Sequence, residues 1–412
     1  MPKPVLDGED TQNEDFVEEL PDEITEDPEA DAKLTAEDVQ DVLLYTLDWS
    51  VQSLLEKIGQ SFDINPAFQR RDAWSRDRKS RYIESLMLGL PVPQVVLAED
   101  KNSKRFIVLD GKQRLMTMKQ FGAPEGQFSA FKLTKLEFLE QLNGKGLDQI
   151  KKSGETAEWV ESFLSQPVRT IVVRNWGKTE VLYEIFRRLN QGSLPLSPQE
   201  LRQALYPGEF STWINETSAN SSAIRRARRL KREDFRMRDA ELLLRSVSFQ
   251  DDIENYDGDL REFLDNMCKR GNAGWKDEQE RYEGYAAAIE KAIERTELVF
   301  QDGNTFMRYV GGDEPAYVRR FNVAVFDTMS MVFSAAELSD SSIRANADGL
   351  RTRFEDLCIE DSEFEAALKS TTKTARATAK RVIAYGGAVE EELGIKLGVV
   401  ERAKRLMASV HK

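Results

Sequence analysis

Three short runs of β-branched and apolar residues in the first half of the chain constrain its fold most strongly. They are Val95–Leu97, Phe106–Leu109 and Val168–Val173. A polar turn at 100–104 separates the first two runs, which is typical of paired strands. From residue 178 onward the apolar residues recur at helical spacing. The pattern predicts an α+β fold, with a small sheet first and an all-α helical domain after it.

Helix starts and ends can be located from their capping residues. Val51–Ile58 has the spacing of an amphipathic helix, Ser75 can cap a helix that runs to about Gly89, and residues 112–121 regain helical spacing. Ser197-Pro198-Gln199-Glu200 combines an N-cap serine, a proline at the first helical position and the glutamate of a capping box. Further helix-length segments lie around 238–249, 258–269, 278–299, 317–337, 361–385 and 388–409.

The charge of the chain is concentrated at its N-terminus. The 412 residues carry a net charge of −14, and residues 1–40 alone hold 15 acidic and 2 basic residues, or −13. The rest is therefore nearly neutral and can still present a basic surface. We predict a disordered acidic arm over 1–40, an α+β domain over 41–195 and an α-helical domain over 196–412. The arm is either a solvated tail or a DNA mimic that covers a basic groove.

Several classes of chemistry are excluded by composition. The only histidine is His411, next to the C-terminal residue, so a Ser-His-Asp hydrolase or a histidine-ligated metal site is not expected. The two cysteines, Cys268 and Cys358, are expected to be buried free thiols. No apolar run approaches the roughly 20 residues that span a bilayer, and the N-terminus is acidic where a signal peptide would be basic. We therefore expect a cytoplasmic protein with no membrane partner.

The segment Asp110-Gly111-Lys112-Gln113-Arg114 is the strongest candidate for a functional site. It joins the end of a predicted strand to the start of a predicted helix, where free N–H groups favour anions. The glycine would let a phosphate approach the backbone, the lysine and arginine would donate to it, and the aspartate could hold a hydrated magnesium ion. Taken alone, an Asp-Gly turn is most often only a turn.

Two other polar segments accompany this turn. They are Asn65–Trp74 and Phe186–Gly192, each at a predicted element end and rich in arginine and amides. Together with Leu109–Arg114, these segments form three motifs in a fixed order along the chain. Besides Leu109–Arg114, the residues that characterise them are Phe68-Gln69-Arg70, Trp74, Arg188-Leu189-Asn190 and Gly192. The set resembles the N-terminal domain of GmrSD-type restriction endonucleases, which is related to the ParB and sulfiredoxin fold. The resemblance covers roughly residues 50–270. It implies a ParB-like nucleotide-binding domain over 41–195 with a small mixed sheet.

The resemblance implies nucleotide binding and hydrolysis at the Asp-Gly-Gln-Gln-Arg motif. Carried over, the catalytic residues are Asp110, Gln113, Arg114 and Asn190, with Asp110 also holding Mg²⁺. The nucleotide-binding residues are Gln69, Arg70, Gly111, Lys112 and Arg188. Lys112 departs from the family, which more often has glutamine there. Many family members also carry a histidine-dependent HNH nuclease domain, so this chain is not expected to be an HNH nuclease by itself.

Residues 225–238 form the most basic segment of the chain, with eight basic and two acidic residues. Such density on a helix can neutralise DNA phosphates without reading bases. The candidate DNA-binding residues are Arg225, Arg226, Arg228, Arg229, Lys231 and Arg232. The alternative is a solvated helix face, or a face paired with the acidic arm.

The sequence thus predicts an Mg²⁺-dependent nucleoside triphosphatase that regulates a DNA-associated restriction or anti-phage complex. The alternatives are a non-catalytic nucleotide- and DNA-binding module, or an adaptor that recruits a separate nuclease. The expected partners are a nucleoside triphosphate, DNA and a nuclease subunit. A second copy of the chain is a further candidate partner.

Overall fold

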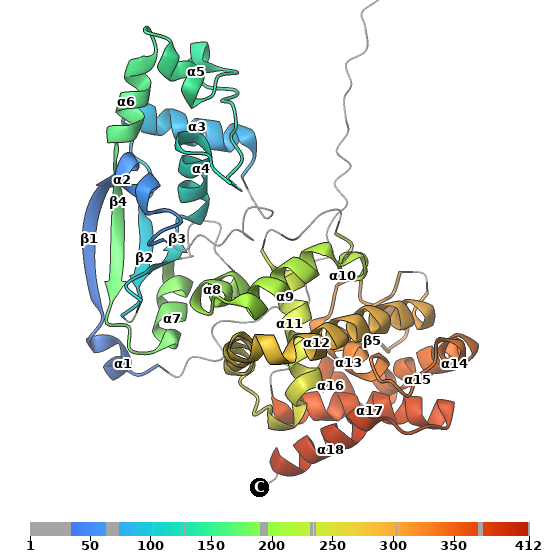
Figure 1. Ribbon diagram of the computed structural model, residues 1–412. Coiled ribbons are helices and arrows are strands. Elements are labelled where there is room, and N and C mark those ends of the chain that lie inside the picture. The colour runs from blue at the N-terminus through green and yellow to red at the C-terminus, as the bar shows by residue number, and fades with distance from the viewer. Residues whose placement is uncertain are drawn as a thin grey trace, which may run out of the picture.

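The computed structural model contains a sheet-bearing region, followed by a region built almost entirely of helices (Figure 1). It describes residues 34–62, 74–101, 103–126, 128–189, 197–230, 234, 236–301, 303–369 and 374–410. Most of the predicted acidic arm, residues 1–33, lies outside these ranges. The end of that arm is helical, because residues 36–40 form one short turn of helix.

The sheet has four strands in the order β1-β4-β2-β3. The outer pairs β1/β4 and β2/β3 are antiparallel, and the central pair β2/β4 is parallel, so the sheet is mixed. The strands are β1 (Leu43–Ser50), β2 (Val95–Glu99), β3 (Phe106–Asp110) and β4 (Pro167–Arg174).

Apolar residues cover both faces of the sheet, as the two-residue period of a strand requires. Val95 and Leu97 of β2 contribute to one hydrophobic core, while Val96 and Ala98 contribute to another. Helices α2, α3, α4 and α6 pack on the first face, and α7 and α8 on the second. The helices of this region are α1 (Ala36–Gln40), α2 (Val51–Lys57), α3 (Arg76–Met87), α4 (Lys112–Gly122), α5 (Leu147–Lys152), α6 (Ala157–Ser165), α7 (Thr179–Leu189) and α8 (Pro198–Leu205).

The helical region has its own hydrophobic core, which runs from Phe210 to Leu406. Its longest element is α12, a single helix of 40 residues with Asp259 as its N-cap. In Figure 1, α8 lies between the sheet and these helices. The helices are α9 (Glu209–Asn220), α10 (Ser222–Arg228), α11 (Arg238–Asp252), α12 (Leu260–Val299), α13 (Val323–Phe333), α14 (Asp340–Ala345), α15 (Ala347–Glu360), α16 (Ser362–Lys369), α17 (Ala375–Leu393) and α18 (Gly398–Val410), with a small ribbon of β5 (Tyr309–Val310) and β6 (Ala316–Tyr317).

The predicted α+β fold is confirmed, as are the three predicted strands and the helices capped by Ser75 and Ser197. The sequence did not indicate β1, whose first residues are exposed and lack an alternating pattern. Two segments predicted as separate helices, 258–269 and 278–299, are both parts of α12. The predicted helix over 361–385 is two helices, α16 and α17, and the one over 317–337 is only α13.

The expected burial of both thiols is also confirmed. Cys268 and Cys358 are free and buried, and burial raises the pKa of each thiol to about 12. None of the helices within the described ranges is long and apolar enough to cross a membrane.

Candidate functional site

The predicted turn lies where β3 ends and α4 begins. Gly111 is the N-cap of α4 and has φ +96°, in the left-handed region that favours glycine. A Cβ there would lie 3.0 Å from Cγ2 of Val95 and 3.2 Å from Nε of Arg114. The turn therefore needs a glycine for both its backbone conformation and its close approach to neighbouring side chains.

Asp110 and Arg114 hold the two sides of this turn together. Oδ1 of Asp110 accepts the Gly111 N–H at 2.7 Å, and Oδ2 accepts Nη2 of Arg114 at 2.7 Å. The same Nη2 donates to the Gln94 carbonyl at 2.9 Å, and Arg114 is only 7 % exposed. The structure thus brings Asp110, Gly111 and Arg114 together, with the guanidinium buried against the turn.

Lys112 points away from this pair toward α8. Its Nζ lies 2.7 Å from Oε1 of Glu200, and both side chains are buried. The sequence marked Glu200 only as part of a capping box. The ion pair joins residues 88 positions apart, which no local pattern could reveal.

Four buried polar side-chain atoms in the first two turns of α4 and on the neighbouring helix α3 have no hydrogen-bond partner among the described residues. They are Oε1 of Gln113, Nε of Arg114, Oγ1 of Thr117 and the hydroxyl of Tyr82 on α3. Burial raises the pKa of the Tyr82 hydroxyl, and the positive charge of the Arg114 guanidinium opposes this rise. Buried polar groups are normally paired, so several unpaired ones beside one turn are unusual. Tyr82 and Thr117 were not predicted; Thr117 lies one helical turn after Arg114, whereas nothing in the sequence marks Tyr82.

The region that carries the turn matches a known protein family. Residues 51–207 match the family model of the GmrSD restriction endonuclease N-terminal domain. These residues are a GmrSD-type N-terminal domain. The match contains the turn, Tyr82 and Glu200, and it confirms the predicted resemblance over residues 51–207 of the roughly 50–270 expected. No curated protein and no solved structure matches the chain.

The ring of Trp74 packs against Tyr82 in the GmrSD-type domain. The Trp74 ring meets the Tyr82 ring edge-on at 5.5 Å, and the Arg78 guanidinium lies 4.6 Å from the centre of the Trp74 ring. Trp74 directly follows residues 63–73, which lie outside the described ranges.

The other predicted nucleotide contacts of the GmrSD-type domain are placed only in part. Gln69, Arg70 and Asn190 lie outside the described residues. Arg188 is exposed near the end of α7, where its Nε donates to Oε1 of Glu184 at 2.6 Å. Their roles therefore stay predictions.

The basic segment lies beyond the GmrSD-type domain, on α10 and the residues after it. Nε of Arg226 donates to Glu297 at 3.1 Å, and Arg228 is 5 % exposed with its guanidinium 4.6 Å from the centre of the Phe321 ring. Arg229 donates to the Gly303 carbonyl, and Arg225 is half-buried. Lys231 and Arg232 are among the residues that the structure does not describe. Arg226, Arg228 and Arg229 thus contact other parts of the protein.

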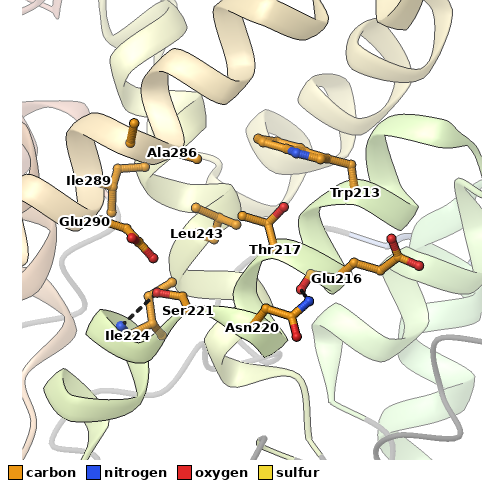
Figure 2. Close-up of a pocket in the computed structure, with 11 residues that line it drawn as sticks. Trp213, Glu216, Thr217, Asn220, Ser221, Ile224, Leu243, Ala286, Ile289 and Glu290 are labelled. Atoms are coloured by element: carbon orange, nitrogen blue, oxygen red, sulfur yellow. Dashed lines mark hydrogen bonds between the residues drawn. The ribbon is translucent and has the colours of Figure 1, made fainter.

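A separate pocket of about 470 Å³ lies between helices α9, α10, α11 and α12. Figure 2 shows the Trp213 ring and Thr217 on one side and Glu290 on the opposite side, with Leu243 between them. None of the predicted site residues lines this pocket. It is therefore distinct from the turn of the GmrSD-type domain.

Proposed function

We propose that the turn from Asp110 to Arg114 binds a nucleoside triphosphate with Mg²⁺ and hydrolyses it. In this proposal, nucleotide turnover regulates a restriction or anti-phage defence complex that acts on DNA. The family match supports the association with restriction. The local structure of the turn supports the nucleotide site.

The start of α4 suits a phosphate. The first N–H groups of a helix, here those of residues 112–114, have no acceptor within the helix and carry a partial positive charge. Gly111 adds no Cβ that would keep an anion from the backbone. Arg114 brings a guanidinium, whose fork of donors fits phosphate oxygens.

The unpaired buried atoms around the turn are the observation that carries the proposal. Leaving one such atom unsatisfied costs about 1–3 kcal/mol, which a ligand with matching groups would recover. A ligand rich in oxygen atoms would satisfy Nε of Arg114, and both hydroxyls, of Tyr82 and Thr117, can donate or accept. A bound nucleotide offers such atoms on its phosphates and ribose.

Asp110 fits the role of a magnesium ligand. Its side chain is 26 % exposed and accepts one hydrogen bond on each oxygen, which leaves lone pairs available on both. One carboxylate with phosphate oxygens and water is a usual magnesium environment, and the ion would neutralise charge on the phosphoryl oxygens. Gln113 would orient the attacking water. By resemblance, Gln69, Arg70, Arg188 and Asn190 would complete the site.

DNA and a separate nuclease subunit remain part of this proposal as partners. The contacts of the basic segment shift the expected DNA surface away from Arg226, Arg228 and Arg229. Arg225, Lys231 and Arg232 are then the remaining candidates from the predicted set.

The test is phosphate release from each of the four ribonucleoside triphosphates with Mg²⁺, with and without DNA. We expect release by the wild-type protein, and a loss of about 10³-fold in Arg114→Ala, the order seen when a phosphate-binding arginine is removed. Asp110→Asn should lose turnover as well, with less disturbance of the turn. Normal turnover in both folded variants would refute the assignment.

Arg169→Ala is the matched control. This arginine is 62 % exposed and pairs with Asp48 on the β1/β4 side of the sheet, away from the turn, so its removal should leave hydrolysis unchanged. Calorimetric binding without turnover would instead support a nucleotide-binding module that does not hydrolyse.

A further inference from the structure

The Lys112–Glu200 ion pair joins the candidate nucleotide site to α8. Lys112 is the first residue of α4, the helix whose N-terminus forms the site. Its Nζ donates to Oε1 of Glu200 at 2.7 Å, and the two side chains are 6 % and 7 % exposed. A buried charge that loses its partner is costly, so this contact fixes the two helices to each other.

The second oxygen of Glu200 holds the start of α8. Oε2 accepts the Ser197 N–H at 2.7 Å, while Oγ of Ser197 accepts the Glu200 N–H at 3.1 Å. A single carboxylate therefore caps α8 and neutralises Lys112. Any group that draws Lys112 away from Glu200 also disturbs the beginning of α8.

Buried polar contacts also tie α8 to the helical region. Nε of Arg202, a fully buried residue, donates to Oδ1 of Asp265 on α12 at 2.8 Å. Gln199 accepts Nη1 of Arg202 at 2.7 Å, and the Tyr206 hydroxyl donates to Oδ2 of Asp265 at 3.1 Å. Helix α8 is thus held by charged groups both at the candidate site and at α12.

A triphosphate at the turn would compete with Glu200 for Lys112. Its negative charges would arrive at the first residue of α4, close to the backbone of Lys112. An ammonium group on a flexible stem can change partners, and the phosphates carry more charge than one carboxylate. The same charges would repel the Glu200 carboxylate.

We propose that Lys112 changes partner when nucleotide binds, leaving Glu200 for the phosphates and thereby loosening α8 from the site. This inference rests on the proposed nucleotide site and adds a means of regulating it. Nucleotide binding and the release of α8 would be coupled, and such coupling is reciprocal. The factor by which bound nucleotide favours release of α8 is therefore the factor by which contacts that hold α8 in place lower nucleotide affinity. The state of the helical region would then set how tightly the turn binds nucleotide.

The first test is the nucleotide affinity of Glu200→Gln, measured by calorimetry with the β,γ-imido analogues of ATP and GTP and Mg²⁺. Removing the competing charge should tighten binding by about 5-fold or more, the lower end of typical coupling. A group that only supports the fold would leave affinity unchanged or weaken it, and either result would overturn the exchange. Glu297→Gln is the matched control, because it removes one carboxylate that pairs with Arg226 in the helical region.

The second test uses the wild-type protein and does not depend on how well a variant folds. Hydrogen exchange of the α8 amides should become faster when the analogue binds. Unchanged or slower exchange in α8, with binding confirmed, would contradict the release of Glu200 while leaving the nucleotide site intact. Failure of both analogues to bind the wild-type protein would refute the proposed site and the exchange together.

Discussion

The turn at 110–114 and the basic segment at 225–238 both combine arginines with helix ends, yet the structure treats them differently. In the basic segment, Arg226, Arg228 and Arg229 contact a carboxylate, an aromatic ring and a carbonyl. At the turn, buried polar atoms of Gln113 and Arg114 have no partner among the described residues. The guanidinium groups of the basic segment therefore contact the protein itself, whereas several unpaired polar atoms gather at the turn.

The reason lies in the cost of burial. A donor atom that already has an acceptor in the protein gains little by turning to a phosphate, since it exchanges one partner for another. A buried polar atom with no partner gains a full hydrogen bond when a ligand supplies it. The three predictions below test this difference, from the largest expected effect to the smallest.

Arg228→Ala should destabilise the protein without affecting DNA binding. Its guanidinium is buried against Phe321, where a desolvated cation–π contact and the packing of its stem together contribute about 2–3 kcal/mol. Urea unfolding measures the loss, and fluorescence anisotropy with labelled duplex DNA measures the affinity. A folded Arg228→Ala variant that keeps its stability but no longer binds DNA would show that the basic segment is a binding site.

Tyr82→Phe should stabilise the nucleotide-free protein and weaken nucleotide binding. Removing a buried hydroxyl that has no partner should raise the free energy of unfolding by about 1 kcal/mol. The same change should weaken nucleotide binding by about 5- to 10-fold, because the ligand loses one hydrogen bond. Thermal unfolding without ligand and calorimetry with it give the two numbers. A loss of stability without ligand would show that the hydroxyl has a structural partner.

Arg226→Ala should have the smallest effect. This arginine pairs with Glu297 while both side chains remain partly exposed, so the change should cost about 0.2–1 kcal/mol. The cost should shrink further in 1 M salt, where exposed pairs are screened. Unfolding at low and high salt provides the measurement, and a salt-independent loss above 2 kcal/mol would contradict the assignment of an ordinary exposed pair.

Local patterns predicted the elements that carry the site. The capping box at Ser197 and Glu200 forms as expected, and the Asp110-Gly111 turn joins a strand to a helix. Both depend on residues within four positions of one another, where spacing alone fixes the geometry. Strand β1 was not predicted, because its exposed Leu43 and Leu44 break the alternation of apolar and polar residues expected of a half-buried strand.

Site residues from distant parts of the chain could not be found in the same way. Tyr82 faces α4 only because α3 and α4 pack on the same face of the sheet. Nothing near Tyr82 in the sequence marks it as part of a site. Lys112 was predicted to donate to phosphate, and its contact with Glu200 on α8 appeared only in the structure.

By itself, the sequence determined strands β2, β3 and β4, the helices capped by Ser75 and Ser197, and the glycine turn before α4. These follow from residue types and short-range spacing, which backbone geometry and hydrogen bonding translate directly into local structure. Only the tertiary structure decided which charges are neutralised and which polar atoms remain unpaired. Those outcomes depend on contacts between helices far apart in the chain, such as Lys112 with Glu200 and Arg202 with Asp265.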